Sequence, residues 1–429
     1  MTRLNRSLPV LAATILGLPA VAAAQTGVAP RTGGAASRYA VADSLADSAP
    51  SSAERSVATL AGYLAQAGGD DLTRARALYR WVAGHISYDV EGFRSGRPGD
   101  PSPEAVLQRR TSVCEGFAQL TQALGRAMGL EVQVVSGWSK GYGYTPGQRF
   151  DGPTNHAWDA VRIDGAWRLM DPTWGAGYLD ESLRFVRRFQ DHYFLTEPAE
   201  FVFDHLPQDS SWQLLDRPVT AAEYADLVYL RPMFFQAGFR IGNHDRLVLD
   251  ADGPLTVTLG VTQPEQMTAQ VLDAATRRQV DGEFAFVQVD SGEARIDARF
   301  PRRGGYLLRV FAKPLGAAGP LEWILDYRVR ASGAPGAVFP TAFEAFGIRG
   351  VRLLGPFDGA LRAGRAYRFA LRAPGALEVA VVAGGRWTRL APQADGFAGD
   401  AIAERGAVTV FAKYDSTGEY EGLLRYEGR

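Results

Sequence analysis

The sequence predicts an α+β protein in which a helical segment, a short sheet and a long all-β region follow one another. Apolar residues recur at helical spacing from about residue 51 to 130. They then alternate with polar residues from 131 to 171, and after about 240 they fall in short runs separated by turn residues. A chain of 429 residues exceeds the usual size of one hydrophobic core, so we expect several domains.

The N-terminus has the pattern of a secretory signal peptide, predicted to span residues 1–24. Arg3 and Arg6 precede an apolar run that ends in an A-x-A arrangement. A membrane anchor is the alternative interpretation, but the run is short and Pro19 interrupts it. We therefore expect a secreted or periplasmic protein with no membrane span. Residues 25–50 are small and polar, and they are predicted to form a flexible leader.

Charge and cysteine content narrow the class of protein. Lys and Arg number 46 against 47 Asp and Glu, so the chain lacks the basic excess that nucleic-acid binding demands. Cys114 is the single cysteine, and it has no partner for a disulfide within the chain. It is either a small buried residue or a nucleophile.

Two helices, over residues 51–66 and 70–89, are predicted to open a first domain that spans 51–235. A third helix is predicted to follow Ser112, because the S-x-x-E pattern of Ser112 and Glu115 is a capping box. Cys114 would then lie in the first helical turn. There the backbone N–H groups and the helix dipole favour the thiolate form of cysteine.

A hairpin is predicted around the Asp164-Gly165 turn, since two-residue D-G turns join alternating strands. In that register Ile163 lies opposite Ala166, and His156 and Asp171 share one face as diagonal neighbours. A single histidine in a strand is usually a surface or core residue. A carboxylate on the same face instead favours a base and its orienting acid.

The C-terminal half is predicted to form two β-sandwich modules, residues 236–333 and 338–429, each of immunoglobulin-like size. The segments RVFAK and TVFAK repeat 100 residues apart, and "ASGAPGAV" (residues 331–338) separates the modules. The modules are expected to act as spacers or docking units, with partner binding as the alternative.

The runs "SVCEGFAQLTQALGRAMGLEVQVVSGW" and "NHAWDAVRIDGAWRLMDPTWG" resemble the transglutaminase-like superfamily, and "HYFLTEPAEFVFDHLPQDSSWQLL" resembles proteins similar to kyphoscoliosis peptidase. The resemblance covers about residues 60–220. It implies a papain-like transglutaminase core with Cys114 as nucleophile, His156 as base and Asp171 as orienting acid. Asp159 stands where relatives often have asparagine, and Ser112 where they often have glycine.

Other candidate residues lie near these three. Gln108 is either an oxyanion donor or a solvated helix residue, and Trp158 and Trp174 either line the acyl site or pack in the core. The remaining histidines have no acidic partner in the sequence pattern and are interpreted as ordinary; these are His85, His192, His205 and His244. No metal and no cofactor are expected.

The sequence thus predicts a cysteine enzyme that cleaves or transfers the acyl group of a peptide or glutamine amide through a thioester. The substrate is expected to be a protein or peptide, and hydrolysis is favoured because water is the default acceptor. The alternative is a catalytically silent binding or scaffold protein of the cell envelope. The sequence leaves the oligomeric state open.

Overall fold

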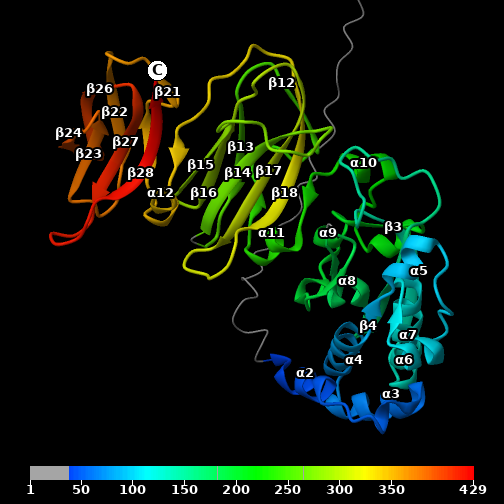
Figure 1. The fold of residues 1–429 in the computed structure, drawn as a ribbon. Helices are drawn as coiled ribbons and strands as arrows, with labels where there is room; N and C mark the ends of the chain where they lie inside the picture. The colour runs from blue at the N-terminus through cyan, green and yellow to red at the C-terminus, as the bar shows by residue number, and fades with distance from the viewer. Residues whose placement is uncertain (1–37, 181, 264) are drawn as a thin grey trace, which may run out of the picture.

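The computed structural model describes residues 38–180, 182–263 and 265–429. Three compact units follow one another in a row, with the N-terminal domain at one end and the red C-terminal unit at the other (Figure 1). Each unit has a hydrophobic core of its own. The mixed α+β prediction is confirmed. The predicted signal peptide lies outside the described residues.

The N-terminal domain contains most of the helices that the structure describes. They are α2 (Ala40–Asp47), α3 (Val57–Leu64), α4 (Asp71–His85), α5 (Val90–Ser95), α6 (Pro103–Arg109), α7 (Cys114–Ala127), α8 (Pro172–Ala176), α9 (Pro198–Phe201) and α10 (Ala221–Asp226), with 3-10 turns η1 (Ala53–Arg55), η2 (Ala65–Ala67), η3 (Asp191–Tyr193) and η4 (Ser210–Gln213). α4 begins where the Asp70 side chain accepts the N–H of Thr73 at 2.7 Å. It buries Leu78, Trp81 and Val82 in the core.

A five-stranded sheet packs against these helices in the order β8-β5-β4-β3-β9. The strands are β3 (Val132–Ser139), β4 (His156–Ile163), β5 (Ala166–Met170), β8 (Phe194–Thr196) and β9 (His205–Pro207). Two small pairs complete the domain, namely β1 (Ser87–Tyr88) with β2 (Thr111–Ser112), and β6 (Gly177–Leu179) with β7 (Phe185–Arg187). The predicted hairpin register is confirmed, because Ile163 pairs with Ala166 and Asp159 with Met170.

The predicted flexible leader is wrong for its last residues. α2 buries Ala42 and Ala46 in the core of the domain, and Asp43 and Asp47 bind arginines of α4. The apolar face of α2 consists largely of alanine, so its i, i+4 pattern carries a weak hydrophobic signal. The domain therefore starts before Ser51.

The predicted capping box at α7 is also wrong. The N-cap residue is Val113, and no side chain caps the helix there. Ser112 belongs instead to β2 and packs against Gly116, whose missing Cβ leaves room for the Ser112 hydroxyl. Cys114 is nevertheless the first residue of α7, as predicted.

The middle unit is a β-sandwich. One sheet has the order β10-β18-β17-β14 with β12 also on β18, and the other has the order β11-β13-β16-β15. The elements are β10 (Tyr229–Leu230), α11 (Pro232–Gln236), β11 (Arg240–Ile241), β12 (Val248–Ala251), β13 (Leu255–Gly260), β14 (Glu265–Asp273), β15 (Ala285–Asp290), β16 (Glu293–Ala298), β17 (Gly304–Pro314) and β18 (Glu322–Ala331). β10 pairs with β18, and Val228 and Phe234 lie in the sandwich core. The predicted boundary at residue 235 is thus too late.

The C-terminal unit is a second sandwich. Its sheets are β19-β28-β27-β23-β24, with β21 also on β28, and β20-β22-β26-β25. The elements are β19 (Thr341–Ala342), α12 (Glu344–Ile348), β20 (Arg352–Gly355), β21 (Ala360–Leu361), β22 (Ala366–Arg372), β23 (Glu378–Ala383), β24 (Arg386–Arg389), β25 (Ala391–Gln393), β26 (Gly396–Ile402), β27 (Gly406–Lys413) and β28 (Glu421–Gly428). Residues 332–340 connect the sandwiches without helix or strand.

The two sandwiches repeat the same strand arrangement. β17 pairs with β18, and that register shifts between Val310 and Phe311. β27 pairs with β28, and the shift there falls between Val410 and Phe411. In both sandwiches a short strand, β12 or β21, then adds parallel to the last strand. The repeat of RVFAK and TVFAK in the sequence therefore corresponds to a repeat in structure.

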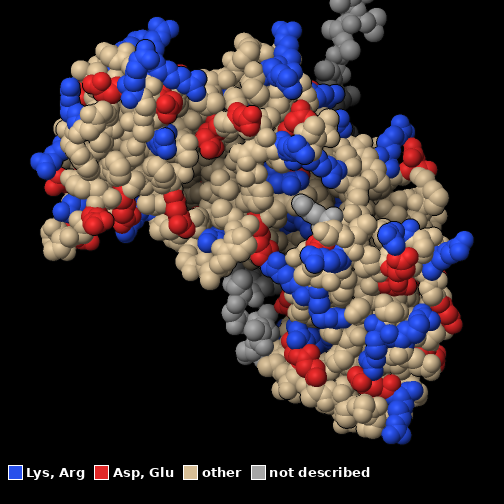
Figure 2. Space-filling view, viewed as in Figure 1, with Lys and Arg blue, Asp and Glu red and all other residues tan. Residues whose placement is uncertain are grey.

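The surface carries both signs of charge. Figure 2 shows Lys and Arg interspersed with Asp and Glu over all three units on this face, in keeping with a formal charge of −1. Within the part of the chain that the structure describes, no helix combines the length and apolarity needed to cross a membrane.

Candidate active site

The thiol of Cys114 lies at the start of α7, where this helix packs against the central strand β4. Val113, in extended backbone, leads into the helix, and the Cys114 side chain is half-buried. Its sulfur shares a hydrogen bond with the ring of His156 and accepts another from the backbone of Ala157. The first residues of β4 therefore hold the imidazole next to the thiol.

His156 and Asp171 meet across the hairpin as the register predicts. His156 is the first residue of β4, and Asp171 directly follows β5 as the N-cap of α8. The Nε2 atom of His156 lies 2.8 Å from Oδ2 of Asp171. Because Nε2 is used in this way, Nδ1 is the ring nitrogen left for the thiol.

Asp171 divides its two carboxylate oxygens between two tasks. Oδ1 accepts the backbone N–H groups of Thr173 at 2.8 Å and Trp174 at 3.1 Å, and so caps α8. Oδ2 accepts the hydrogen bond of the His156 ring. The aspartate is fully buried, so these donors replace the water that would otherwise solvate its charge.

The electrostatics favour a thiolate and an imidazolium. Burial alone would raise the pKa of the Cys114 thiol. The hydrogen bond and charge of His156 lower this pKa by more than burial raises it, so it lies below its ordinary value. Burial lowers the pKa of His156, whereas the charge of Asp171 and its hydrogen bond raise it to about 10. Burial would raise the pKa of Asp171, yet His156 and His205 hold it well below its usual range.

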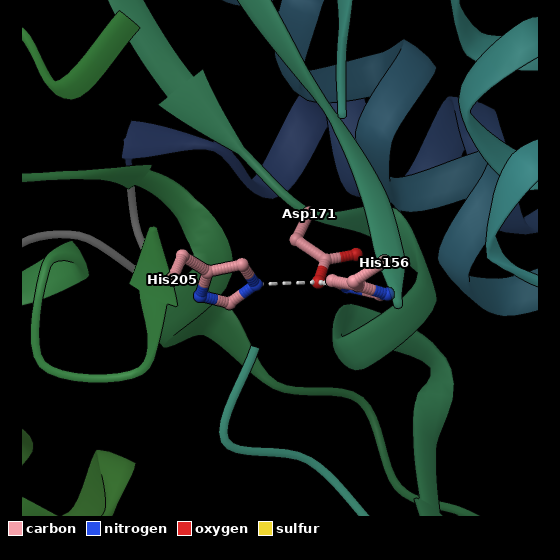
Figure 3. A group of neighbouring side chains, drawn as sticks. All are labelled: His156, Asp171 and His205. Atoms are coloured by element: carbon pink, nitrogen blue, oxygen red, sulfur yellow. Dashed lines mark hydrogen bonds and ion pairs between the residues drawn. The ribbon is translucent and has the colours of Figure 1, made fainter. Parts of the chain in front are cut away.

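A second histidine, His205, binds the same aspartate. Its Nε2 atom lies 3.1 Å from Oδ2 of Asp171, and Figure 3 shows Asp171 between the two imidazoles. Its Nδ1 atom lies 2.6 Å from Oδ1 of Asp204. Interpreting His205 as an ordinary residue was wrong. His205 belongs to β9, 34 residues beyond Asp171. The local sequence pattern does not indicate that this strand pairs with β3.

These three residues are also the group whose side chains could hold a metal ion. One ligand atom each of His156, Asp171 and His205 lie within 4.8 Å of one another, and all three side chains are buried. Two imidazoles and a carboxylate suit a transition metal. Here, however, the Asp171 oxygen already accepts both imidazoles in hydrogen bonds, and the His156 ring also serves the thiol.

The other predicted site residues have different positions. Trp158 is buried and packs against Phe201 and His205, so it supports the site from inside the core. Trp174 is half-buried, with its ring 5.3 Å from that of His156. Gln108 is exposed on α6, whose neighbours Val106 and Leu107 face the core. Gln108 is therefore a solvated helix residue, the alternative given above.

Aromatic side chains contact one another in a series that begins near the thiol. The Tyr88 hydroxyl lies within electrostatic range of Cys114, and its ring packs edge-on against Phe93 at 5.8 Å. Phe93 in turn meets Tyr142 at 6.3 Å, and both of these rings are exposed. Trp174 contacts the same loop at Gly141. This set, Tyr88, Phe93, Tyr142 and Trp174, is the aromatic rim.

Asp159 is the unusual acid of the domain. It is fully buried on β4, and neither of its carboxyl oxygens has a hydrogen-bond partner among the residues that the structure describes. Burial and the charge of Asp171 raise the pKa of Asp159 well above its ordinary value. This environment therefore favours the neutral form of the Asp159 carboxyl group.

Comparison with known proteins assigns families to two parts of the chain. Residues 58–172 match the family described as "Transglutaminase-like superfamily", and this range contains Cys114, His156 and Asp171. Residues 221–341 match the family described as "KY-like, immunoglobulin-like domain". The second range covers the middle sandwich.

Relatives with curated names are similar over a larger part of the chain. Kyphoscoliosis peptidase of Mus musculus is 30% identical over 271 residues, which is 63% of this chain and 40% of that protein. Hillarin of Drosophila melanogaster is 29% identical over 59% of this chain and 34% of its own length. Lim and transglutaminase domain protein ltd-1 of Caenorhabditis elegans is 32% identical over 39% of this chain and 24% of its own. The chain thus spans two fifths or less of the length of these relatives.

Proposed function

Because this chain contains a transglutaminase-like superfamily domain followed by a KY-like, immunoglobulin-like domain, we propose that it is a cysteine enzyme acting on amide carbonyls of polypeptides. The observation that carries the proposal is the continuous hydrogen-bonded series from Cys114 through His156 to Asp171. A nucleophile, a base and an orienting acid in this order are the components of covalent acyl transfer.

In the first half-reaction the Cys114 thiolate attacks the carbonyl carbon of the amide. A C–S bond forms, and negative charge develops on the carbonyl oxygen near the uncapped first turn of α7, whose backbone N–H groups can stabilise it. The C–N bond then breaks as the His156 imidazolium gives its proton to the leaving amine. The products of this half-reaction are a thioester and a neutral imidazole.

In the second half-reaction an acceptor attacks the thioester carbon. Neutral His156 removes a proton from water, the C–S bond breaks, and a carboxylic acid leaves while the thiolate and imidazolium are restored. An amine acceptor would instead give a new amide bond. We favour water, since bulk water reaches a half-buried thiol without a dedicated binding site.

The aromatic rim supports a polypeptide substrate. The rings of Phe93 and Tyr142 are exposed and connect through Tyr88 to the neighbourhood of Cys114, so they offer apolar contact area for side chains that flank the reacting carbonyl. We also propose that the protein acts outside the cytoplasm, on the basis of the signal-peptide pattern in residues 1–24. Mass spectrometry of the N-terminus of the protein recovered from its source tests this second point.

The activity is tested by comparing wild-type protein with Cys114→Ala in an extract of extracytoplasmic proteins. We expect new peptide termini with wild type alone, read by N-terminal proteomics. New isopeptide links in place of new termini would identify an acyltransferase. If neither product forms and Cys114 has an ordinary thiol pKa of about 8.5, the protein is a binding or scaffold protein instead.

A further inference from the structure

His205 is one member of a closed ring of hydrogen bonds that includes Asp171. From Asp171 Oδ2 the ring runs to His205 Nε2, and from His205 Nδ1 to Asp204. The hydroxyl of Tyr193 donates to Asp204 Oδ2 at 2.9 Å. The backbone N–H of Asp171 donates to the carbonyl of Tyr193 at 2.9 Å, which returns the ring to its start.

The imidazole of His205 is also fixed by packing. Phe201 stacks on it at 4.0 Å with the planes 15° apart, and Trp174 lies 4.5 Å away on centroid distance. The side chain is wholly buried. Rotation of this imidazole would therefore break two hydrogen bonds to carboxylates inside the buried core, where the freed polar groups would be left unpaired.

We propose that His205 is a positioning residue, which holds Asp171 in the orientation that His156 needs and sustains its charge. The inference rests on the proposed function, because it concerns the same site. A histidine with only a structural role needs no acidic partners, whereas both nitrogens of His205 face carboxylate oxygens.

The consequence for the thiol follows from the order of the groups. A carboxylate that accepts N–H groups keeps its charge despite burial. Loss of the His205 donor would weaken the hold of Asp171 on the His156 imidazolium, and less imidazolium means less thiolate at Cys114. The other titratable or charged groups in electrostatic range of this ring of bonds are Tyr79, Tyr88, Lys140, Asp159, Tyr224, Tyr229 and Arg231.

The test measures the rate of Cys114 alkylation by iodoacetamide from pH 4 to 10, with intact mass as the readout. Cys114 is the single cysteine, so the mass shift reports this thiol alone. We expect wild type to react well below pH 8 and His205→Ala to need a higher pH. A shift of one pH unit is about a tenfold loss of rate on the acid side of the profile.

Three further variants separate positioning from folding. His205→Gln keeps an N–H donor and should recover part of the reactivity at low pH. Tyr193→Phe removes one hydroxyl of the ring of bonds and should shift the pH profile of alkylation in the same direction, by a smaller amount. This variant keeps the test possible if His205→Ala does not fold. His244→Gln, in the middle sandwich, is the matched control and should match wild type.

The outcomes distinguish the two proposals. An ordinary thiol profile for wild type would overturn the proposed chemistry, and the positioning role with it. A low-pH profile for wild type that His205→Ala and Tyr193→Phe leave unchanged would overturn the role of His205 alone. Equal losses in His205→Ala and His205→Gln, with unaltered melting temperatures, would also contradict it.

Discussion

Two buried aspartates of the same sheet region have pKa values shifted in opposite directions, because their partners differ. Asp171 accepts two backbone N–H groups and two imidazoles, so its carboxylate is compensated. Asp159 has none of these donors and keeps its proton. With Asp159 neutral, Asp171 is the carboxylate that raises the pKa of His156, together with the Cys114 thiolate. At the scale of single residues, the hydrogen-bond donors around each acid therefore decide which of the two carries the negative charge that the site needs.

The neutral state of Asp159 has a measurable effect on stability. Its pKa in the folded protein is raised, so the unfolded chain loses this proton first as the pH rises above about 4. The contribution to stability is thus complete at low pH and declines as the pH increases. Asp159→Asn removes this decline, and its stability relative to wild type should grow with pH by up to about 1.4 kcal/mol per unit.

Urea unfolding followed from pH 4 to 8 checks this prediction. Asp164→Asn, at the exposed turn of the same hairpin, is the matched control and should show no comparable trend. A stability difference between Asp159→Asn and wild type that stays constant over this range would mean that Asp159 is ionised in the folded protein.

At the scale of elements, the sequence predicts best what is local. The D-G turn and strict alternation determine the hairpin register, and that register alone places His156 against Asp171. His205 was missed because the pairing of β9 with β3 is set by long-range packing. The cap of α7 was mispredicted because Ser112 pairs in a sheet. The boundary of the middle sandwich was missed because β10 has only two residues.

Gly137 shows how closely these strands approach one another. It pairs with His156 on one side and Pro207 on the other. A Cβ atom at Gly137 would lie 2.1 Å from the carbonyl oxygen of Leu206 and 2.6 Å from the ring of Trp158. The absent side chain therefore lets β9 bring His205 to the site.

Gly137→Ala should separate β9 from β3 and displace His205. We expect a loss of about 1–3 kcal/mol in the free energy of unfolding, together with slower alkylation of Cys114 below pH 7. Gly152→Ala is the matched control, since a Cβ there meets nothing within 4 Å. Both effects are measured by urea unfolding and intact mass. Equal stability of the two variants would show that the strands can adjust.

At the scale of the whole molecule, Lys140 lies where the N-terminal domain meets the middle sandwich. It is fully buried, and its Nζ donates to the carbonyl of Leu227 at 3.1 Å and lies 4.5 Å above the ring of Tyr224. The hydroxyl of Tyr229, in β10, donates to the Lys140 carbonyl at 3.0 Å. Burial lowers the pKa of Lys140 to about 7, although the negative charges of Asp204 and Asp226 act to raise it.

This buried lysine makes the contact between the domains sensitive to pH. Between about pH 7 and 10 the unfolded chain binds a proton that the folded protein does not, so stability increases with pH over this window. Lys140→Met removes that gain. The difference in melting temperature, wild type minus Lys140→Met, should therefore become more positive from pH 7 to 10.

Differential scanning calorimetry of both proteins across this range measures the effect. Lys313→Met is the matched control, because Lys313 binds a carbonyl on the exposed side of the middle sandwich. A melting-temperature difference independent of pH would contradict the assignment of a lowered pKa to Lys140.

The matching register shifts of the two sandwiches also determine where one strand of each sheet bends. Such a bulge needs one extra residue inserted at one place in one strand. The extra residue is Ile324 of β18, opposite Val310 and Phe311, in the middle sandwich. It is Leu423 of β28, opposite Val410 and Phe411, in the C-terminal sandwich. A bulge bends its strand and increases the local right-handed twist, so both sandwiches curve their last strand at an equivalent place.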